Sequence, residues 1–349
     1  MMTNMNPSDF RQAGTTYGKP VSLVSLELIA TQGGEPALPP NIDVIGLRTI
    51  TNAAKLSAHK AHGPHPDVSE HDIEIPIRDG STIPTRVYYP AEKVDTKVSL
   101  PLLIFFHGGG FCIGSRYDDF QSNRAIALRN SVVVVSPEYR LAPEHPFPTA
   151  VHDGLDPLQW VAANAHTIHS SASPSAGLIV GGTSSGGNIA SAVVYLNRDQ
   201  DFPVNVTGQF LSVAPLLPAP VVPEEYRQEH LSVEQNKEIS IPSSDLVQLF
   251  LSAYKPNIHS PLMVPFNHPE RHHDIPSTYF QVCGLDALRD DSLIYERVLR
   301  EENSIATRLD FYPGLPHHFW EFYPQLTQHA QRRTEDTVNG IQWLLELGR

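Results

Sequence analysis

The chain has 349 residues, of which 40% are hydrophobic and 18% are charged, the composition of a globular protein with a substantial core. The 25 Lys and Arg residues stand against 38 Asp and Glu residues, giving a net charge of −13. Since no basic block occurs, nucleic acid and anionic membrane surfaces are excluded as expected partners. Two cysteines are too few for a disulfide framework, and no segment has the roughly 18 apolar residues of a membrane span, so we expect a cytoplasmic protein with no membrane-spanning segment.

The N-terminal region divides into a tail, two helical patterns and a hairpin. Residues 1–20 are polar and rich in small side chains, and we expect them to be flexible. Residues 21–65 contain VSLVSLELIA and IDVIGLRTITNAAKLSAHK, two helical patterns that we assign to the N-terminal part of a cap. The following HDIEIPIRDGSTIPTRVYYP alternates apolar and polar residues around Asp79-Gly80, which predicts a β-hairpin, and Pro76 indicates that its first strand is an edge strand.

Beyond the hairpin, strand patterns alternate with helical patterns. Several strands are continuous apolar runs, as in a parallel sheet that helices cover on both faces. We therefore assign residues 66–349 to an α/β domain with a mostly parallel, doubly wound sheet. The predicted strands are residues 102–107, 131–136, 177–182, 208–214, 278–283 and 308–313. The helical patterns include AIALRN, TAVHDGLDPLQWVAANA, NIASAVVYLNRD, RDDSLIYERVLREEN and TEDTVNGIQWLLELG.

One stretch, at about residues 216–276, interrupts this alternation. It has many prolines, one helical pattern, SSDLVQLFLSAY, and no strand pattern. A connection this long inside a compact domain is usually functional, often as a lid. We expect an insertion in the α/β domain that forms a helical cap together with residues 21–65.

The segment GLIVGGTSSGGNIA contains Gly-x-Ser-x-Gly where a predicted strand passes into a helix. This context favours a nucleophile elbow over a flexible linker, because an elbow holds its serine exposed on a sharp strand-to-helix turn. The residues two before and two after that serine approach each other and must both lack a side chain, as Gly182 and Gly186 do. A pattern centred on Ser185 would need glycine where Thr183 stands, so Ser184 is the predicted nucleophile.

A serine hydroxyl needs a base to accept its proton and an acid to orient that base. After an elbow serine, the acid and then the histidine follow along the chain. Asp286 and His317 occur in this order, each just beyond a predicted strand, at the edge where the carboxyl ends of parallel strands meet. His318 is the alternative base. Asp290 and Asp291 are alternative acids, but they would start the next helix, where acidic residues are commonly simple cap charges.

The strand LLIFF ends in HGGGF, residues 107–111. The transition state of acyl transfer develops an oxyanion that needs preorganised N–H donors, and a loop without side chains lets backbone amides approach it. An HGGG loop supplies such donors together with the residue that follows the nucleophile. The predicted oxyanion hole consists of the backbone N–H groups of Gly108, Gly109, Gly110 and Ser185.

These motifs, with SPEYRLAPEHPFPTAV between them and RDGSTIPTRVYYP before them, resemble the hormone-sensitive-lipase-like family of α/β-hydrolases over nearly the whole chain. The resemblance implies the α/β-hydrolase fold and hydrolysis of carboxylic esters without a cofactor. It assigns the nucleophile to Ser184, the acid to Asp286 and the base to His317. Arg140 and Glu144 would brace a loop near the site.

The match to the family has three departures. Thr183 stands where Asp is frequent, although a second branch of the family has Thr there, and Ser185 stands where Ala is usual. His318 replaces a common glycine. Because the expected donor at residue 185 is a backbone N–H, we expect an intact oxyanion hole. The family also implies a mostly apolar cleft for short-chain acyl esters of small molecules. We expect Phe111 and Phe319 to line it, whereas Leu246 and Phe250 either line it or form the core of the cap.

The stretch NHPERHHD admits a metal site, because His268 and His272 have the spacing of one helical face. Pro269 argues against a helix there, so we expect an exposed loop of the cap connection and no metal. Two other functions stay open. An amidase or a pathway-specific deacetylase of a natural product would use the same triad, whereas a small-molecule receptor typically lacks one triad member. The sequence makes no prediction of oligomeric state.

Overall fold

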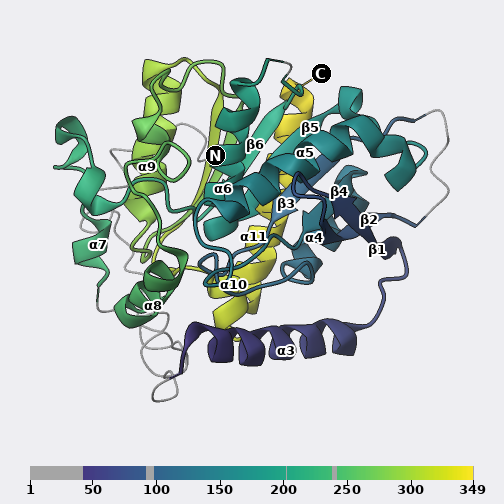
Figure 1. The fold of residues 1–349 in the computed structure, drawn as a ribbon, viewed down its shortest axis with the longest axis horizontal. Coiled ribbons are helices and arrows are strands. Elements are labelled where there is room, and N and C mark those ends of the chain that lie inside the picture. The colour runs from purple at the N-terminus through teal and green to yellow at the C-terminus, as the bar shows by residue number, and fades with distance from the viewer. Residues whose placement is uncertain (1–41, 92–97, 202, 238–241, 349) are drawn as a thin grey trace.

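The computed structural model describes residues 42–91, 98–201, 203–237 and 242–348. The predicted flexible tail, residues 1–20, and the first predicted cap helix lie outside these residues. An eight-stranded sheet runs through the molecule with helices on both of its faces (Figure 1). The strand order is β1-β2-β4-β3-β5-β6-β7-β8, which places β5, the strand that leads into Ser184, in the interior of the sheet.

The predicted hairpin and the mostly parallel sheet are confirmed. The strands are β1 (Val68–Pro76), β2 (Thr82–Pro90), β3 (Leu102–Phe106), β4 (Val133–Pro137), β5 (Leu178–Thr183), β6 (Gly208–Ser212), β7 (Thr278–Cys283) and β8 (Thr307–Tyr312). β1 and β2 pair antiparallel, with β1 at the sheet edge, and β2 also pairs antiparallel with β4. All other pairings are parallel.

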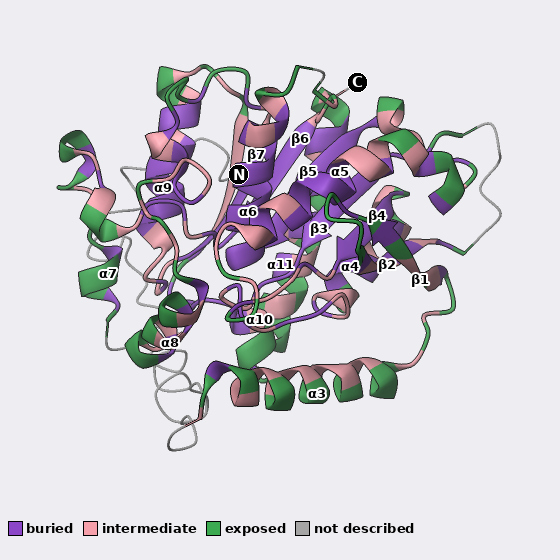
Figure 2. Cartoon of the chain, in the orientation of Figure 1, coloured by how far each residue is buried: buried purple, intermediate pink, exposed green. Residues whose placement is uncertain are grey.

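Hydrophobic side chains cover both faces of the sheet because strand residues alternate between the faces. On β3, Leu102, Ile104 and Phe106 belong to one core cluster, and Leu103 and Phe105 belong to the other. The first face packs against α5 (Thr149–Ile168), α6 (Ser185–Arg198) and α9 (Arg289–Arg297), and the second against α4 (Phe120–Asn130) and α11 (Thr327–Leu347). The central strands are accordingly buried along their length (Figure 2).

The helices outside these two layers include α3 (Val44–His62), which lies apart from the sheet along one side of the molecule (Figure 1). The described part of residues 216–276 has no strand and contains α7 (Ser232–Gln235) and α8 (Ser244–Tyr254). α3 and α8 contact each other. The short α10 (Phe319–Phe322) precedes α11, and the remaining turns are η1 (Pro174–Ala176), η2 (Ala219–Val221), η3 (Glu224–Tyr226), η4 (Pro265–Asn267) and η5 (Val298–Glu302).

Helix α6 begins at Ser185, three residues before the predicted NIASAVVYLNRD pattern. The reason is close packing: a Cβ on Gly187 would lie 2.7 Å from Ala214 Cβ, so this glycine belongs to a helix packed tightly on its neighbour rather than to a loop. None of the described helices combines the length and the apolar character needed to cross a membrane.

Candidate active site

Ser184 occupies a sharp turn between β5 and α6, with φ 53° and ψ −121°, a conformation that is strained for a residue with a side chain. The flanking glycines make this turn sterically feasible. A Cβ on Gly182 would lie 2.4 Å from the backbone of Gly186, and a Cβ on Gly186 would lie 2.1 Å from the carbonyl oxygen of Phe106. The Gly-x-Ser-x-Gly spacing is therefore a packing requirement of this strand–turn–helix junction.

Three side chains from the carboxyl ends of different strands meet at this turn. His317, which follows β8, donates from Nδ1 to Asp286 Oδ2 at 2.7 Å, and its Nε2 lies 3.1 Å from Ser184 Oγ. The other carboxylate oxygen of Asp286, which follows β7, accepts the backbone N–H of Leu288 at 2.9 Å. Asp286 and His317 are buried. This arrangement leaves Nε2 of His317 facing the hydroxyl of Ser184.

His318, the alternative base, does not share this geometry. Its ring stacks on that of His317, with centroids 5.1 Å apart, and its Nδ1 donates to Glu321 Oε2 at 3.2 Å. Burial lowers the pKa of His318 from 6.5 to about 4, so the ring is neutral near pH 7. The structure thus brings His317, and not His318, within hydrogen-bond distance of Ser184.

Asp290 and Asp291, the alternative acids, lie in the first turn of α9, whereas the carboxylate that contacts His317 is that of Asp286. Both are buried, and their carboxylates hold the insertion against α9. Backbone N–H groups donate to them at 2.7–2.9 Å, from Leu231 and Ser232 to Asp290 and from Leu216 and Leu217 to Asp291. His230 Nε2 contacts Asp291 at 2.8 Å. The prediction of simple cap charges is therefore wrong, because buried carboxylates require donors and the insertion supplies them.

The glycine loop, residues 107–111, lies beside the turn that carries Ser184. Gly109 and Gly110 have positive φ, 119° and 59°, and a Cβ on Gly110 would lie 2.2 Å from the Phe250 ring. A Cβ on Gly108 would lie 3.3 Å from His318 Cε1. The glycine loop therefore contacts the turn that carries Ser184, the side chain of His318 and helix α8. The N-terminus of α6, which begins at Ser185, adds unpaired amides that favour an anion at the same place.

Tyr139 is a contact that sequence reasoning missed. Its hydroxyl donates to the carbonyl of His107 at 2.9 Å and lies 3.5 Å from Ser185 Oγ, and its ring stacks on His107 with centroids 4.3 Å apart. It thereby joins the glycine loop to the first turn of α6. Tyr139 lies within SPEYRLAPEHPFPTAV, one of the motifs shared with the family, and that motif could have pointed to it. The two residues named there instead, Arg140 and Glu144, form ion pairs with Asp153 and Arg48 at 2.7 and 2.8 Å.

The four expected pocket residues separate into different environments. Phe111 stacks on Tyr254, with centroids 3.9 Å apart, and Phe250 packs against the glycine loop. Leu246, on α8, belongs with both to the main core cluster. All four side chains are buried, and Phe319 belongs to a separate cluster that does not include the glycine loop. Phe111 and Phe250 are the two that lie at the glycine loop.

His268 and His272 do not form the predicted exposed loop. Both are buried: His268 Nε2 contacts Asp199 Oδ2 at 2.8 Å, and His272 Nδ1 contacts the hydroxyl of Tyr195 at 2.5 Å. The predicted exposure is wrong for these two histidines because aromatic rings, including Phe266, contact their imidazoles, whereas residues 269–271 and 273–274 of the loop are exposed. Within residues 42–91, 98–201, 203–237 and 242–348, no three His, Cys, Asp or Glu side chains are grouped as a metal would require.

Residues 103–321 match the family described as the alpha/beta hydrolase fold. An AB hydrolase superfamily protein of Schizosaccharomyces pombe is 36% identical over 80% of both chains. A versiconal hemiacetal acetate esterase of Aspergillus parasiticus is 30% identical over 91% of this chain and 96% of that protein. The carboxylesterase NlhH of Mycobacterium tuberculosis is 32% identical over 70% of this chain and 73% of that protein.

A solved structure extends this similarity to the arrangement of the chain. The crystal structure of vibralactone cyclase superposes with a TM-score of 0.82 at 29% identity, over 93% of this chain and 95% of that one. The chain belongs to the α/β-hydrolase fold family, as its resemblance to the hormone-sensitive-lipase-like members predicted.

Proposed function

We propose that this protein is a serine-dependent carboxylic-ester hydrolase that acts through an acyl-enzyme on short-chain acyl esters of small molecules. The observation that carries the proposal is the hydrogen-bonded series from Asp286 through His317 to Ser184 at the carboxyl edge of the sheet. Two relatives of the chain, from Aspergillus parasiticus and Mycobacterium tuberculosis, are esterases by name.

In this mechanism His317 accepts the hydroxyl proton as Ser184 Oγ attacks the ester carbonyl. Asp286 keeps the imidazole in the tautomer that presents Nε2 to the serine and stabilises the imidazolium that forms. The C–O bond to the alcohol then breaks, His317 protonates the leaving alcohol, and a water molecule hydrolyses the acyl-enzyme by the reverse sequence. The oxyanion accepts hydrogen bonds from the backbone N–H groups of Gly108, Gly109, Gly110 and Ser185.

We assign α3 and the insertion at about residues 216–276 to a cap, which covers the rest of the α/β domain of residues 66–349. The contact between α3 and α8 supports this division. Phe111 and Phe250, beside the glycine loop, are the side chains we expect to limit acyl length. A cytoplasmic location stays a prediction from the cysteine content.

Hydrolysis of p-nitrophenyl esters from acetyl to dodecanoyl, by the wild type and Ser184→Ala side by side, tests the proposal. We expect turnover that is fastest with short chains and a kcat lower by a factor on the order of 10⁴–10⁶ in Ser184→Ala. Near-wild-type turnover by Ser184→Ala would refute the assignment of the nucleophile.

A second candidate is a deacetylase dedicated to one natural product, favoured by the similarity to the versiconal hemiacetal acetate esterase over 91% of the chain. Such an enzyme would leave the simple esters intact, yet a fluorophosphonate would still label Ser184. An amidase would hydrolyse acyl p-nitroanilides at rates comparable to the esters. Absence of both turnover and labelling would instead indicate a non-catalytic receptor.

A further inference from the structure

Helix α3 contacts the rest of the protein through a polar face. Arg48, Asn52, Lys55 and His59 recur every three or four residues, so they lie along one side of the helix. We call these four residues the polar stripe. Val44 is the one buried residue of α3, so burial of apolar surface does little to fix the position of this helix (Figure 2). Arg48, Asn52 and Lys55 hold the helix by hydrogen bonds and ion pairs.

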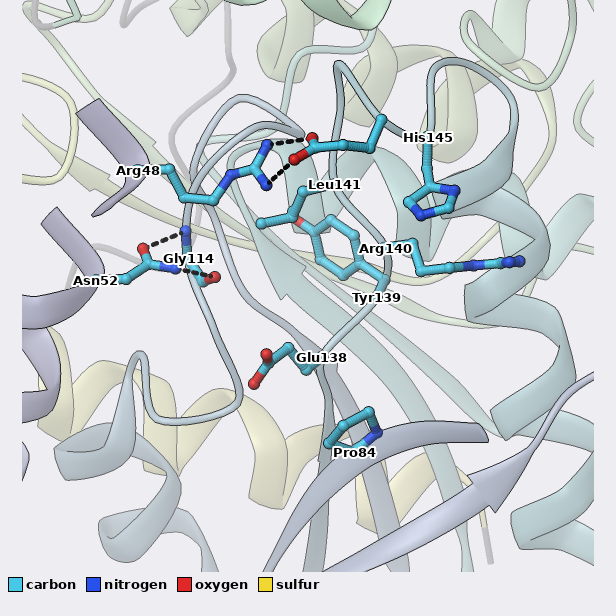
Figure 3. A pocket seen from close by; sticks show the side chains of 10 residues that line it. Arg48, Asn52, Pro84, Gly114, Glu138, Tyr139, Arg140, Leu141 and His145 are labelled. Atoms are coloured by element: carbon cyan, nitrogen blue, oxygen red, sulfur yellow. Dashed lines mark hydrogen bonds and ion pairs between the residues drawn. The ribbon is translucent and has the colours of Figure 1, made fainter. Parts of the chain in front are cut away.

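Asn52 binds both backbone groups of one residue in the oxyanion loop, which we define as residues 107–114. Its Nδ2 donates to the carbonyl of Gly114 at 2.9 Å, and its Oδ1 accepts the N–H of Gly114 at 2.9 Å (Figure 3). Gly114 in turn packs on the start of the loop, because a Cβ there would lie 2.7 Å from the carbonyl oxygen of Gly108. Asn52 thus fixes the residue that abuts an expected oxyanion donor.

Arg48 provides a second anchor one helical turn earlier. Its Nε donates to the carbonyl of Cys112 at 2.7 Å, and its guanidinium pairs with Glu144 across a cleft of about 350 Å³ (Figure 3). The N–H of Cys112 donates to the carbonyl of Gly109 at 3.0 Å. Two side chains of α3 therefore hold the backbone of the oxyanion loop at two points.

Lys55 extends the contact to the loop that carries the proposed base. Its Nζ lies 2.5 Å from Asp118 Oδ2 and 2.8 Å from Glu321 Oε1. Burial by itself lowers the pKa of Lys55, but these two carboxylates outweigh burial and raise it above its ordinary value, so the ammonium stays charged. Glu321 accepts a hydrogen bond from His318, whose ring stacks on His317.

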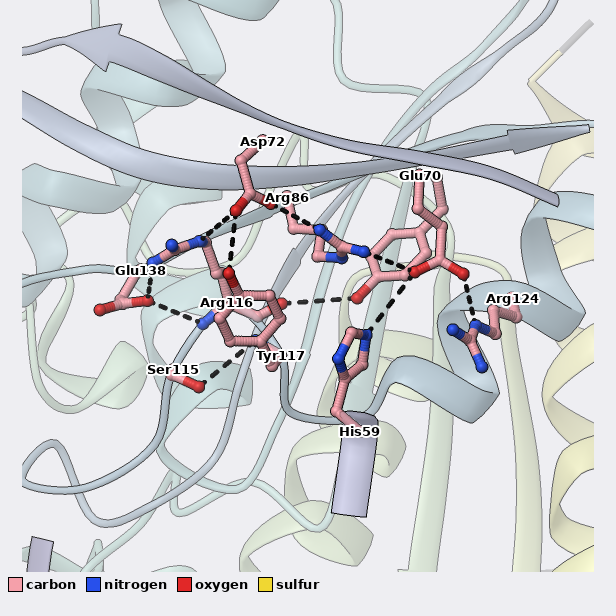
Figure 4. A network of polar contacts seen from close by, with 10 residues as sticks. His59, Glu70, Asp72, Arg86, Ser115, Arg116, Tyr117, Arg124 and Glu138 are labelled. Carbon is pink, nitrogen blue, oxygen red and sulfur yellow. Dashed lines mark hydrogen bonds and ion pairs between the residues drawn. The ribbon is translucent and has the colours of Figure 1, made fainter. Parts of the chain in front are cut away.

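His59 lies near the C-terminal end of the helix, where its ring packs edge-on against Phe120 of α4 with centroids 5.0 Å apart. Its Nε2 lies 3.7 Å from Glu70 of β1, and the same carboxylate pairs with Arg86 and Arg124 at 2.9 and 2.6 Å (Figure 4). This network ties α3 to the β1–β2 hairpin and to α4. The hairpin is part of the sheet and α4 packs against one sheet face, so these contacts connect the C-terminal end of α3 to the main body of the fold.

From these contacts we propose that Asn52 is a positioning residue for ester hydrolysis: it holds the oxyanion loop, through Gly114, where the backbone N–H groups of Gly108 to Gly110 meet the developing oxyanion. The inference rests on the proposed function. Displacement of catalytic groups by about 1 Å can lower rates about 100-fold, so two hydrogen bonds to this loop matter more for turnover than for folding.

Kinetics of Asn52→Ala with p-nitrophenyl acetate test the proposal. We expect kcat to fall about 10- to 100-fold with KM nearly unchanged, because the amides meet the oxyanion in the transition state rather than in the ground state. The inhibition constant of a trifluoromethyl ketone, whose serine adduct presents the same oxyanion, should rise by the factor by which kcat/KM falls. Thr49→Ala is the matched control, since the Thr49 hydroxyl donates only to Ile45 within α3, and it should leave both quantities unchanged.

Each outcome decides the matter. Wild-type kcat and inhibition constant in Asn52→Ala would overturn the inference, and so would a rise in KM alone, which would indicate substrate binding. An inactive wild type would refute the proposed function instead. If Asn52→Ala does not fold, Asn52→Asp keeps an acceptor for the Gly114 N–H and carries the same test, with a loss in kcat at unchanged KM expected.

Discussion

Two regions beside Ser184 are held in place by opposite means. The elbow depends on backbone packed against backbone: Gly186 leaves no space for a side chain next to Phe106, and the surrounding strands are buried. Helix α3 depends on hydrogen bonds and ion pairs of polar side chains such as Asn52 and Lys55, with Val44 as its one buried residue. Ser184 is therefore fixed by the sheet itself, whereas the oxyanion loop is also held by side chains of a helix that lies outside the sheet.

The largest effect concerns the histidines at the elbow. His317→Ala should lower kcat for p-nitrophenyl acetate by a factor on the order of 10⁴–10⁶, because Ser184 loses its base. His318→Ala should lower it by no more than about tenfold, since His318 faces Glu321. Steady-state kinetics of both variants give the comparison, and equal losses would contradict the assignment of the base.

The insertion is attached to α9 in a third way, through the buried carboxylate of Asp291. Asp291→Ala removes the acceptor for two backbone N–H groups and for His230, so we expect a loss of about 3–5 kcal/mol in the free energy of unfolding. Urea denaturation measures this loss. Asp245→Ala, at the exposed start of α8, serves as the control and should cost no more than about 1 kcal/mol.

Glycine substitutions compare the elbow and α3 directly. Gly186→Ala should destabilise the protein by about 3 kcal/mol, because its Cβ would meet the Phe106 carbonyl at 2.1 Å. Gly46→Ala in α3 places a Cβ 3.2 Å from the exposed Asp43 carboxylate, and we expect a change within about 1 kcal/mol. Similar destabilisation in thermal or urea unfolding would remove the distinction between the two regions.

The smallest effect is a dependence of stability on pH. Burial lowers the pKa of His272 from 6.5 to about 4, so the unfolded chain binds this proton more readily than the folded one. Stability is thus fully present above pH 6.5 and declines as the pH falls towards 4, by about 2–3 kcal/mol for this residue. Urea midpoints between pH 7 and 4.5 should fall less steeply in His272→Gln, and an unchanged slope would refute this source.

Sequence patterns predicted those positions that directly follow a recognisable strand along the chain. Ser184, Asp286 and His317 each follow a strand with a distinct apolar pattern, and a parallel sheet collects such positions at one edge. Asn52 and Lys55 had no comparable signal. Their partners lie 62 or more residues away, and polar residues on an amphipathic helix resemble an ordinary solvated face.

The buried histidines were unpredictable for a related reason. NHPERHHD is polar throughout, which is typical of an exposed loop, and the rings that enclose it belong to α6 and α9. Tyr195 and Tyr295 come from two helices about 100 residues apart, and their hydroxyls are joined at 2.8 Å beside His272. Only the assembled fold shows that His268 and His272 are covered.

We propose above that Ser184 is the nucleophile of an ester hydrolase. Mass-spectrometric mapping of a fluorophosphonate adduct tests it most directly, because the reagent reacts with a serine that is activated by its neighbours. We expect one adduct in the wild type, on Ser184. It should be absent in Ser184→Ala and retained in Ser185→Ala. An adduct on Ser185, or equal labelling of Ser184→Ala, would contradict the proposal.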